Sequence, residues 1–71
     1  MTPELVLEIL EELQRQGGAI KDSILYQILK KRYNLSPREF NRILMILELR
    51  RLIYVETIKK GEKLIQLYSK L

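Results

Sequence analysis

The tetrapeptide at residues 36–39 constrains the fold most, because it fixes where a helix begins. Ser36 is a favourable N-cap, Pro37 suits the first helical position, and Glu39 follows the cap by three residues, which completes a capping box. Apolar residues then recur at helical spacing at Phe40, Ile43, Leu44 and Leu47. We therefore predict a third helix over residues 36–51 that buries one of its sides.

The opposite side of this predicted helix has polar residues in its first two turns. Arg38 and Arg42 carry guanidinium groups, and Asn41 carries an amide. These are the side chains that pair with base edges when the start of a helix enters the major groove of DNA. The same pattern is also compatible with an ordinary surface helix whose arginines are solvated.

Two further helices are predicted before the third. Thr2 as N-cap and Pro3 at the first position open a helix that ends at Gln16, before the pair Gly17-Gly18. A second helix begins with Asp22 as its cap and ends in the basic run at residues 30–32. Only residues 33–35 separate it from the third helix, and such a short connection predicts a helix-turn-helix.

After Leu52 the hydrophobic period changes from helical to twofold. Residues 53–58 and 63–68 are rich in β-branched and aromatic side chains, and residues 59–62 between them contain Gly61. We predict a β-hairpin with a basic tip at residues 59–63. An isolated hairpin is marginal in water, so it should pack on the helices, and residues 19–21 can join it as a third strand.

Composition excludes most catalytic functions. A chain of 71 residues predicts one domain spanning residues 1–71. It contains no cysteine and no histidine, and it has no recognisable nucleophile–base pair. We therefore expect a protein that is not an enzyme, with no cofactor and no metal. No apolar run approaches the length of a membrane span, and the N-terminus does not resemble a signal peptide, which predicts a cytoplasmic protein.

Charge is distributed unevenly along the chain. The net charge is +4, but residues 1–20 carry −3 and residues 21–71 carry +7. This separation predicts an acidic back and a basic face, which would orient the domain toward a polyanion. Small proteins that are stable to heat are also rich in Lys, Arg and Glu, which form ion pairs at the surface. Charge alone therefore supports nucleic-acid binding only weakly.

The predicted order of elements is helix, short strand, helix, turn, helix and β-hairpin. The chain thus resembles a winged helix-turn-helix domain, an α+β fold that is mainly α, and in particular the small winged-helix proteins of archaea and their viruses. The residues that carry the resemblance are Gly18-Ala19-Ile20, Leu35-Ser36, Phe40-Asn41-Arg42-Ile43-Leu44, Leu47-Glu48 and Leu52-Ile53. Many winged helices have Gly where this chain has Arg51, so Arg51 either bears strain or the third helix ends differently.

The resemblance implies binding to double-stranded DNA by a small transcription regulator, which would be associated with the nucleoid. The third helix would lie in the major groove and the wing on the phosphate backbone. The residues that fall at these places are Lys21, Ser23, Ser36, Arg38, Asn41, Arg42, Lys59, Lys60 and Lys63. One copy has few contacts, so a homodimer is expected.

The second half of the third helix is apolar nearly all round. Met45, Ile46 and Leu49 add apolar surface on the side of Arg38 and Arg42. One alternative is that the hairpin or Leu71 folds across them. A second is that they form a subunit or partner interface together with Leu7, which lies outside the apolar stripe of the first helix. A third is that Met45 contacts thymine methyl groups. The interface alternative describes a protein-interaction module within a larger complex, to which the tyrosines would also contribute.

Overall fold

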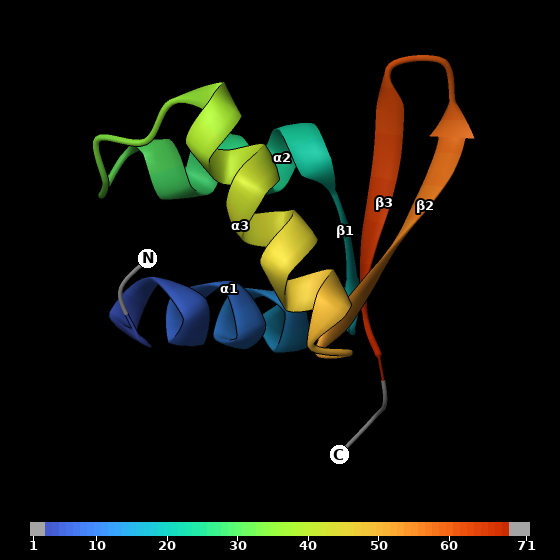
Figure 1. Cartoon of the computed structure of the whole chain (residues 1–71), viewed down its shortest axis with the longest axis horizontal. Helices are drawn as coiled ribbons and strands as arrows, with labels where there is room; N and C mark the ends of the chain where they lie inside the picture. Colours follow the sequence, from blue (N-terminus) through green and yellow to red (C-terminus); the bar gives the residue numbers. More distant parts are fainter. Residues whose placement is uncertain (1–2, 69–71) are drawn as a thin grey trace.

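A computed structural model describes residues 3–68, which form a small α+β fold that is mainly helical (Figure 1). The predictions for Thr2 and Leu71 lie outside the described residues. Along the chain the elements are α1 (Pro3–Arg15), β1 (Ala19–Lys21), α2 (Asp22–Lys30), α3 (Pro37–Leu49), β2 (Ile53–Lys59) and β3 (Glu62–Leu67). The predicted number and order of helices and strands are therefore confirmed within residues 3–68.

The capping box that opens α3 is confirmed. The backbone N–H of Glu39 donates to the Ser36 hydroxyl over 3.1 Å, and the N–H of Ser36 donates to Glu39 Oε1 over 3.0 Å. The helix ends at Leu49 with Arg50 as its C-cap, so its end comes slightly earlier than predicted. Two backbone donors that would otherwise lack partners are satisfied, which fixes the start of α3.

Left-handed residues terminate both α1 and α3. Gly17 ends α1 with φ 82°, and Gly18 N–H donates to the Leu13 carbonyl over 2.7 Å. At the end of α3, Arg51 takes the same role with φ 59°, and Leu52 N–H donates to the Leu47 carbonyl over 3.0 Å. Both ends have the Schellman hydrogen bond. Of the two alternatives for Arg51, the structure shows the strained one, because its Cβ is unfavourable in this conformation.

The start of α2 differs from the prediction. Asp22 is the first helical residue and not the N-cap, which is Lys21 and makes no side-chain capping bond. The Asp22 carboxylate instead accepts from two backbone donors, Ser23 N–H over 2.8 Å and Lys63 N–H over 3.3 Å. This residue therefore ties the start of α2 to β3, a contact between segments far apart in the sequence.

The three strands form an antiparallel sheet in the order β1-β3-β2. Ile20 of β1 and Val55 of β2 both pair with Ile65 of β3, which confirms that residues 19–21 join the hairpin. A bulge interrupts the register between Thr57 and Lys59 near the tip. Opposed residues share a face, so Ile65 and its partners point toward the helices.

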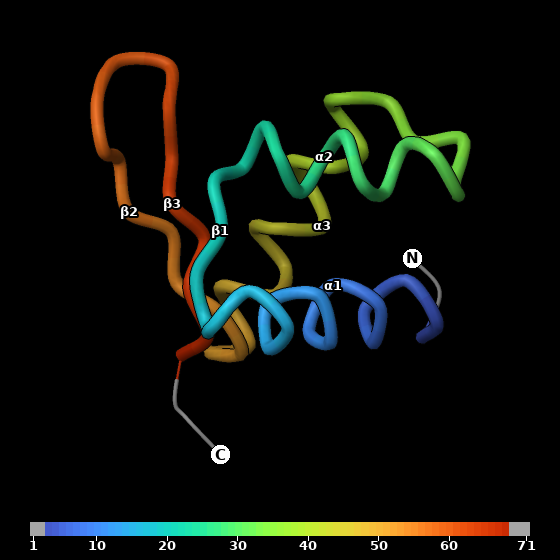
Figure 2. Tube along the Cα trace, turned by 180° about the vertical axis from the view of Figure 1, so that it is seen from behind, coloured from blue at the N-terminus to red at the C-terminus, as the bar shows by residue number. Residues whose placement is uncertain are grey.

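The helices cover one face of this sheet, and α1 lies along the edge farthest from the hairpin tip (Figures 1 and 2). Leu35 is buried between α2 and α3, and its carbonyl accepts from the Tyr26 hydroxyl over 2.8 Å. The Tyr26 ring also packs against Phe40, with ring centroids 5.2 Å apart. The buried core comprises Leu5, Ile9, Leu13, Ile20, Leu25, Leu29, Leu35, Phe40, Ile43, Leu44, Leu47, Ile53 and Ile65.

Candidate nucleic-acid interface

The first two turns of α3 present a polar face to solvent. Arg38, Asn41 and Arg42 are exposed, while Phe40 and Leu44 point into the core. Neither Arg38 nor Arg42 forms a salt bridge with any residue between 3 and 68. Because the capping box fixes the start of this helix, its guanidinium donors project from a rigid element and are free to bind an external acceptor.

A small hollow separates the start of α2 from the start of α3. Its volume is about 210 Å³, and its lining includes Ser23 from α2 and Asn41 from α3. The structure therefore brings together two of the predicted site residues from different helices. The Asp22 carboxylate also lines the hollow, and its oxygen Oδ1 accepts from two backbone N–H groups.

The hairpin tip adds two exposed lysines on the same side of the molecule. Lys60 lies in the turn, and Lys63 pairs with Thr57 on the sheet face that carries Ile65. Neither lysine has a salt-bridge partner among the described residues. In Figure 1 the tip lies toward the same edge as the starts of α2 and α3, opposite α1. The predicted wing lysines Lys60 and Lys63 thus lie on the basic side.

Lys21 and Lys59 differ from these two lysines because they share one carboxylate. Lys59 Nζ lies 3.1 Å from Glu62 Oε2, and Lys21 Nζ lies 3.4 Å from Glu62 Oε1. The hydrogen bond from Lys59, helped by Lys21, holds the pKa of Glu62 below its ordinary value. The register places this trio on the sheet face away from Ile65. Two of the nine predicted DNA contacts are therefore partly neutralised.

Sequence reasoning did not identify Glu62 as part of this site. The spacing of three residues between Lys59 and Glu62, which flank a tight turn, could have predicted their salt bridge. Its contact with Lys21 depends on the pairing of β1 with β3, which brings Lys21 opposite Leu64. That pairing is a long-range feature, so no local pattern could reveal the full trio.

The acidic side chains of α1 lie on the opposite edge of the molecule and are partly compensated there. Glu8 Oε1 accepts from Arg32 over 2.9 Å, and Glu12 accepts from Arg15 over 2.8 Å and from Gln16 over 2.9 Å. The hydrogen bond from Gln16, followed by that from Arg15, lowers the pKa of Glu12. The acidic helix α1 thus lies away from the hairpin tip (Figure 1), and Arg15 and Arg32 compensate two of its carboxylates.

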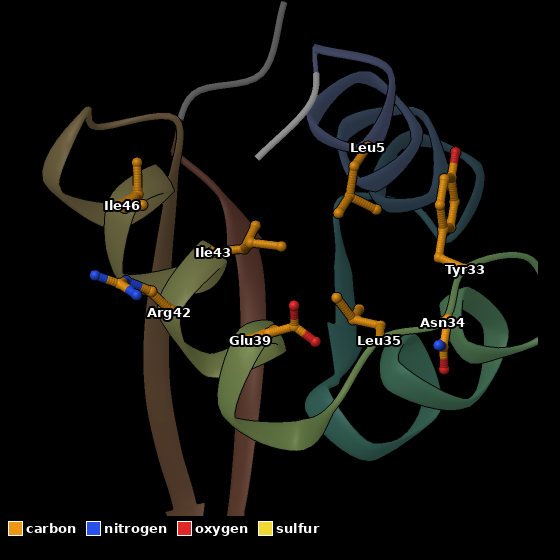
Figure 3. A pocket seen from close by; sticks show the side chains of 8 residues that line it. All are labelled: Leu5, Tyr33, Asn34, Leu35, Glu39, Arg42, Ile43 and Ile46. Carbon is orange, nitrogen blue, oxygen red and sulfur yellow. The ribbon is translucent and has the colours of Figure 1, made fainter.

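An open cavity of about 430 Å³ lies beside α3, between the start of α1 and the α2–α3 connection (Figure 3). In Figure 3, Arg42 points away from the Glu39 carboxylate, so it stands at the rim. The backbone hydrogen bond from Ser36 lowers the pKa of Glu39, which is thereby engaged in the capping box. The cavity is lined by Leu5, Tyr33, Asn34, Leu35, Glu39, Arg42, Ile43 and Ile46.

The apolar stripe predicted on the outer side of α3 is not covered by the described residues. Met45 is 60% exposed and Leu49 is 78% exposed, while Ile46 is half-buried at the cavity. The expectation that the hairpin folds across this stripe is wrong; the alternative cover, Leu71, lies outside the described residues. Leu7 on α1 is also exposed, at 57%. These side chains remain available to a partner.

Comparison with known proteins adds no assignment. No protein-family model matches the chain, and no curated protein or solved structure matches it. Between residues 3 and 68 there is no group of three or more acidic side chains that could hold a metal ion. Over the same residues, every helix is too short or too polar to cross a membrane.

Proposed function

We propose that the chain is a winged helix-turn-helix DNA-binding protein that acts as a small transcription regulator. The observation that carries the proposal is the common placement of Arg38, Asn41 and Arg42 on the exposed start of α3, on the same side as the hairpin tip. The acidic helix α1 lies on the opposite edge (Figure 1). A duplex approaching this side meets cations that form no salt bridge with any residue from 3 to 68.

Each group has a physical role in this proposal. The start of α3 enters the major groove, where Arg38 or Arg42 pairs with guanine O6 and N7 and Asn41 pairs with adenine. Lys60 and Lys63 bind phosphate oxygens as point charges and carry no sequence information. The Ser23 hydroxyl, close to Asn41 across the hollow, donates to a phosphate. One copy makes few contacts, so specific binding requires a second copy.

A matched pair of substitutions on α3 tests the proposal. Arg38 and Arg50 are both exposed arginines without salt bridges in the described part of the chain, and they stand at opposite ends of the helix. Arg38→Ala should weaken binding to a target duplex by about 1–3 kcal/mol, and Arg50→Ala should have little effect. Fluorescence anisotropy measures the affinities, and circular dichroism confirms the fold. Equal affinities for both variants would contradict the assignment of the groove-reading end.

A protein-interaction module is the second candidate, and the exposure of Met45 and Leu49 favours it. Such a protein would associate with its partner in a manner that tolerates salt, since apolar burial is not screened. Leu49→Glu should then abolish association without changing helicity, because the side chain is already in solvent. A protein that fails to bind duplex DNA at low salt would make this candidate the leading one.

A further inference from the structure

Two exposed helix faces carry apolar side chains framed by charges of opposite sign. On α1, Leu7 stands between Glu4 and Glu11 at helical spacing of three and four residues. Glu4 and Glu11 are exposed and form no salt bridge with any residue in the range 3–68. We call these three residues the acidic face of α1.

The complementary surface lies on the outer side of α3. Met45 and Leu49 follow Arg38 and Arg42 on the same face, at spacings of three and four residues. Within the described chain both arginines lack a salt-bridge partner. We call these four residues the basic face of α3.

The two faces cannot meet within one copy. Each is turned away from the core that α1 and α3 share, and Figures 1 and 2 place α3 at the front of the molecule and α1 along its lower edge. The exposed apolar groups of each face therefore require a second molecule if they are to be removed from water.

Charge decides which surface of that second molecule fits. A twofold contact between two acidic faces brings glutamates together, because Glu4 and Glu11 flank Leu7 on both sides, and one between two basic faces joins no charges of opposite sign. Like charges brought together at an interface cost free energy. The acidic face of one copy against the basic face of another joins opposite charges and buries Leu7 against Met45 and Leu49.

We infer that the acidic face of α1 on one copy docks on the basic face of α3 on another copy, in a head-to-tail contact. A pair joined in this way retains an unused basic face on one copy and an unused acidic face on the other, so the assembly continues into a ring or an open chain rather than stopping at a closed dimer. Few apolar side chains take part, so the association is weak and grows with protein concentration. The contact uses Arg38 and Arg42, which the proposed function places in the major groove, so DNA and a second copy would compete for the same α3; self-association is therefore measured without DNA.

Two variants that each disable one face test the inference. Leu7→Lys places a cation in the acidic face, and Leu49→Glu places an anion in the basic face; both sites are exposed, so folding should be retained. Sedimentation equilibrium without DNA, at low salt and over a wide range of concentration, measures the mass. Ile24→Lys, a change at an exposed apolar residue of α2, is the matched control. Circular dichroism verifies the fold of every variant.

The expected result is a complementation pattern. The natural chain and Ile24→Lys gain mass with concentration, each single-face variant stays monomeric, and an equal mixture of the two variants forms a species of two copies. That species arises because one variant keeps its basic face and the other keeps its acidic face. A monomeric natural chain, a single-face variant that still self-associates, or a mixture that stays monomeric would overturn the inference.

Discussion

Removing the ammonium group of Lys60 should lower the salt dependence of DNA binding by one phosphate contact. The exposed cations on the proposed binding side that lack salt bridges within residues 3–68 are Arg38, Arg42, Lys60 and Lys63. On a random-sequence duplex, where neither arginine has a matched guanine, we expect all four cations to bind phosphates. Each phosphate contact contributes about −0.9 to the slope of log affinity against log salt, so four contacts give about −3.6. A fourfold rise in salt then weakens binding of the natural chain about 150-fold, and that of Lys60→Ala about 40-fold.

Fluorescence anisotropy with a random-sequence duplex at several salt concentrations gives both slopes. Lys31→Ala is the matched control, because Lys31 is an exposed lysine just beyond the end of α2, away from the hairpin (Figure 1). Its slope should equal that of the natural chain. A natural slope near zero, or a loss of slope in Lys31→Ala but not in Lys60→Ala, would refute the proposed binding side.

Three further predictions concern single residues. Glu62→Gln frees Lys21 and Lys59 from their shared carboxylate, so the same assay should show tighter DNA binding and a steeper slope; unchanged affinity would mean that neither lysine reaches the duplex. Arg51→Gly should raise the free energy of unfolding by about 1 kcal/mol in urea titrations, because glycine is unstrained at φ 59°, whereas Arg51→Ala should give no such gain. Because the pKa of Glu39 is lowered in the folded state, the Glu39 carboxylate stabilises the fold at pH values above its ordinary pKa of 4.5. That stabilisation is lost as the pH falls through the folded-state pKa. The melting temperature of Glu39→Gln should therefore depend less on acid pH than that of the natural chain.

Local sequence signals predicted most of the fold. The capping box of α3 involves Ser36 and Glu39, which lie within one helical turn, so their spacing alone was decisive. The change to a twofold period after Leu52 located the hairpin for the same reason. The exposed polar face at the start of α3 followed directly from helical spacing, because the core side of that helix was unambiguous.

The features that sequence reasoning missed depend on contacts between distant segments or on the size of the fold. Asp22 was predicted as a cap, but its carboxylate also accepts from Lys63, which only the docked hairpin supplies. For Met45 and Leu49 the apolar second half of α3 left several alternatives open, namely cover by the hairpin or by Leu71, an interface, or contact of Met45 with thymine methyl groups, and the structure removes cover by the hairpin. A chain this short has one sheet, and that sheet packs against the opposite side of α3, so within residues 3–68 no element remains to cover them.

The order β1-β3-β2 makes β3, the last of the described elements in sequence, the central strand of the sheet. Ile65 in that strand is fully buried and pairs with both neighbours. During synthesis, the helices and the first two strands therefore leave the ribosome before the strand that joins them exists. The nascent chain has to remain without its native sheet until β3 emerges, so native folding is a late, nearly single event rather than a stepwise one.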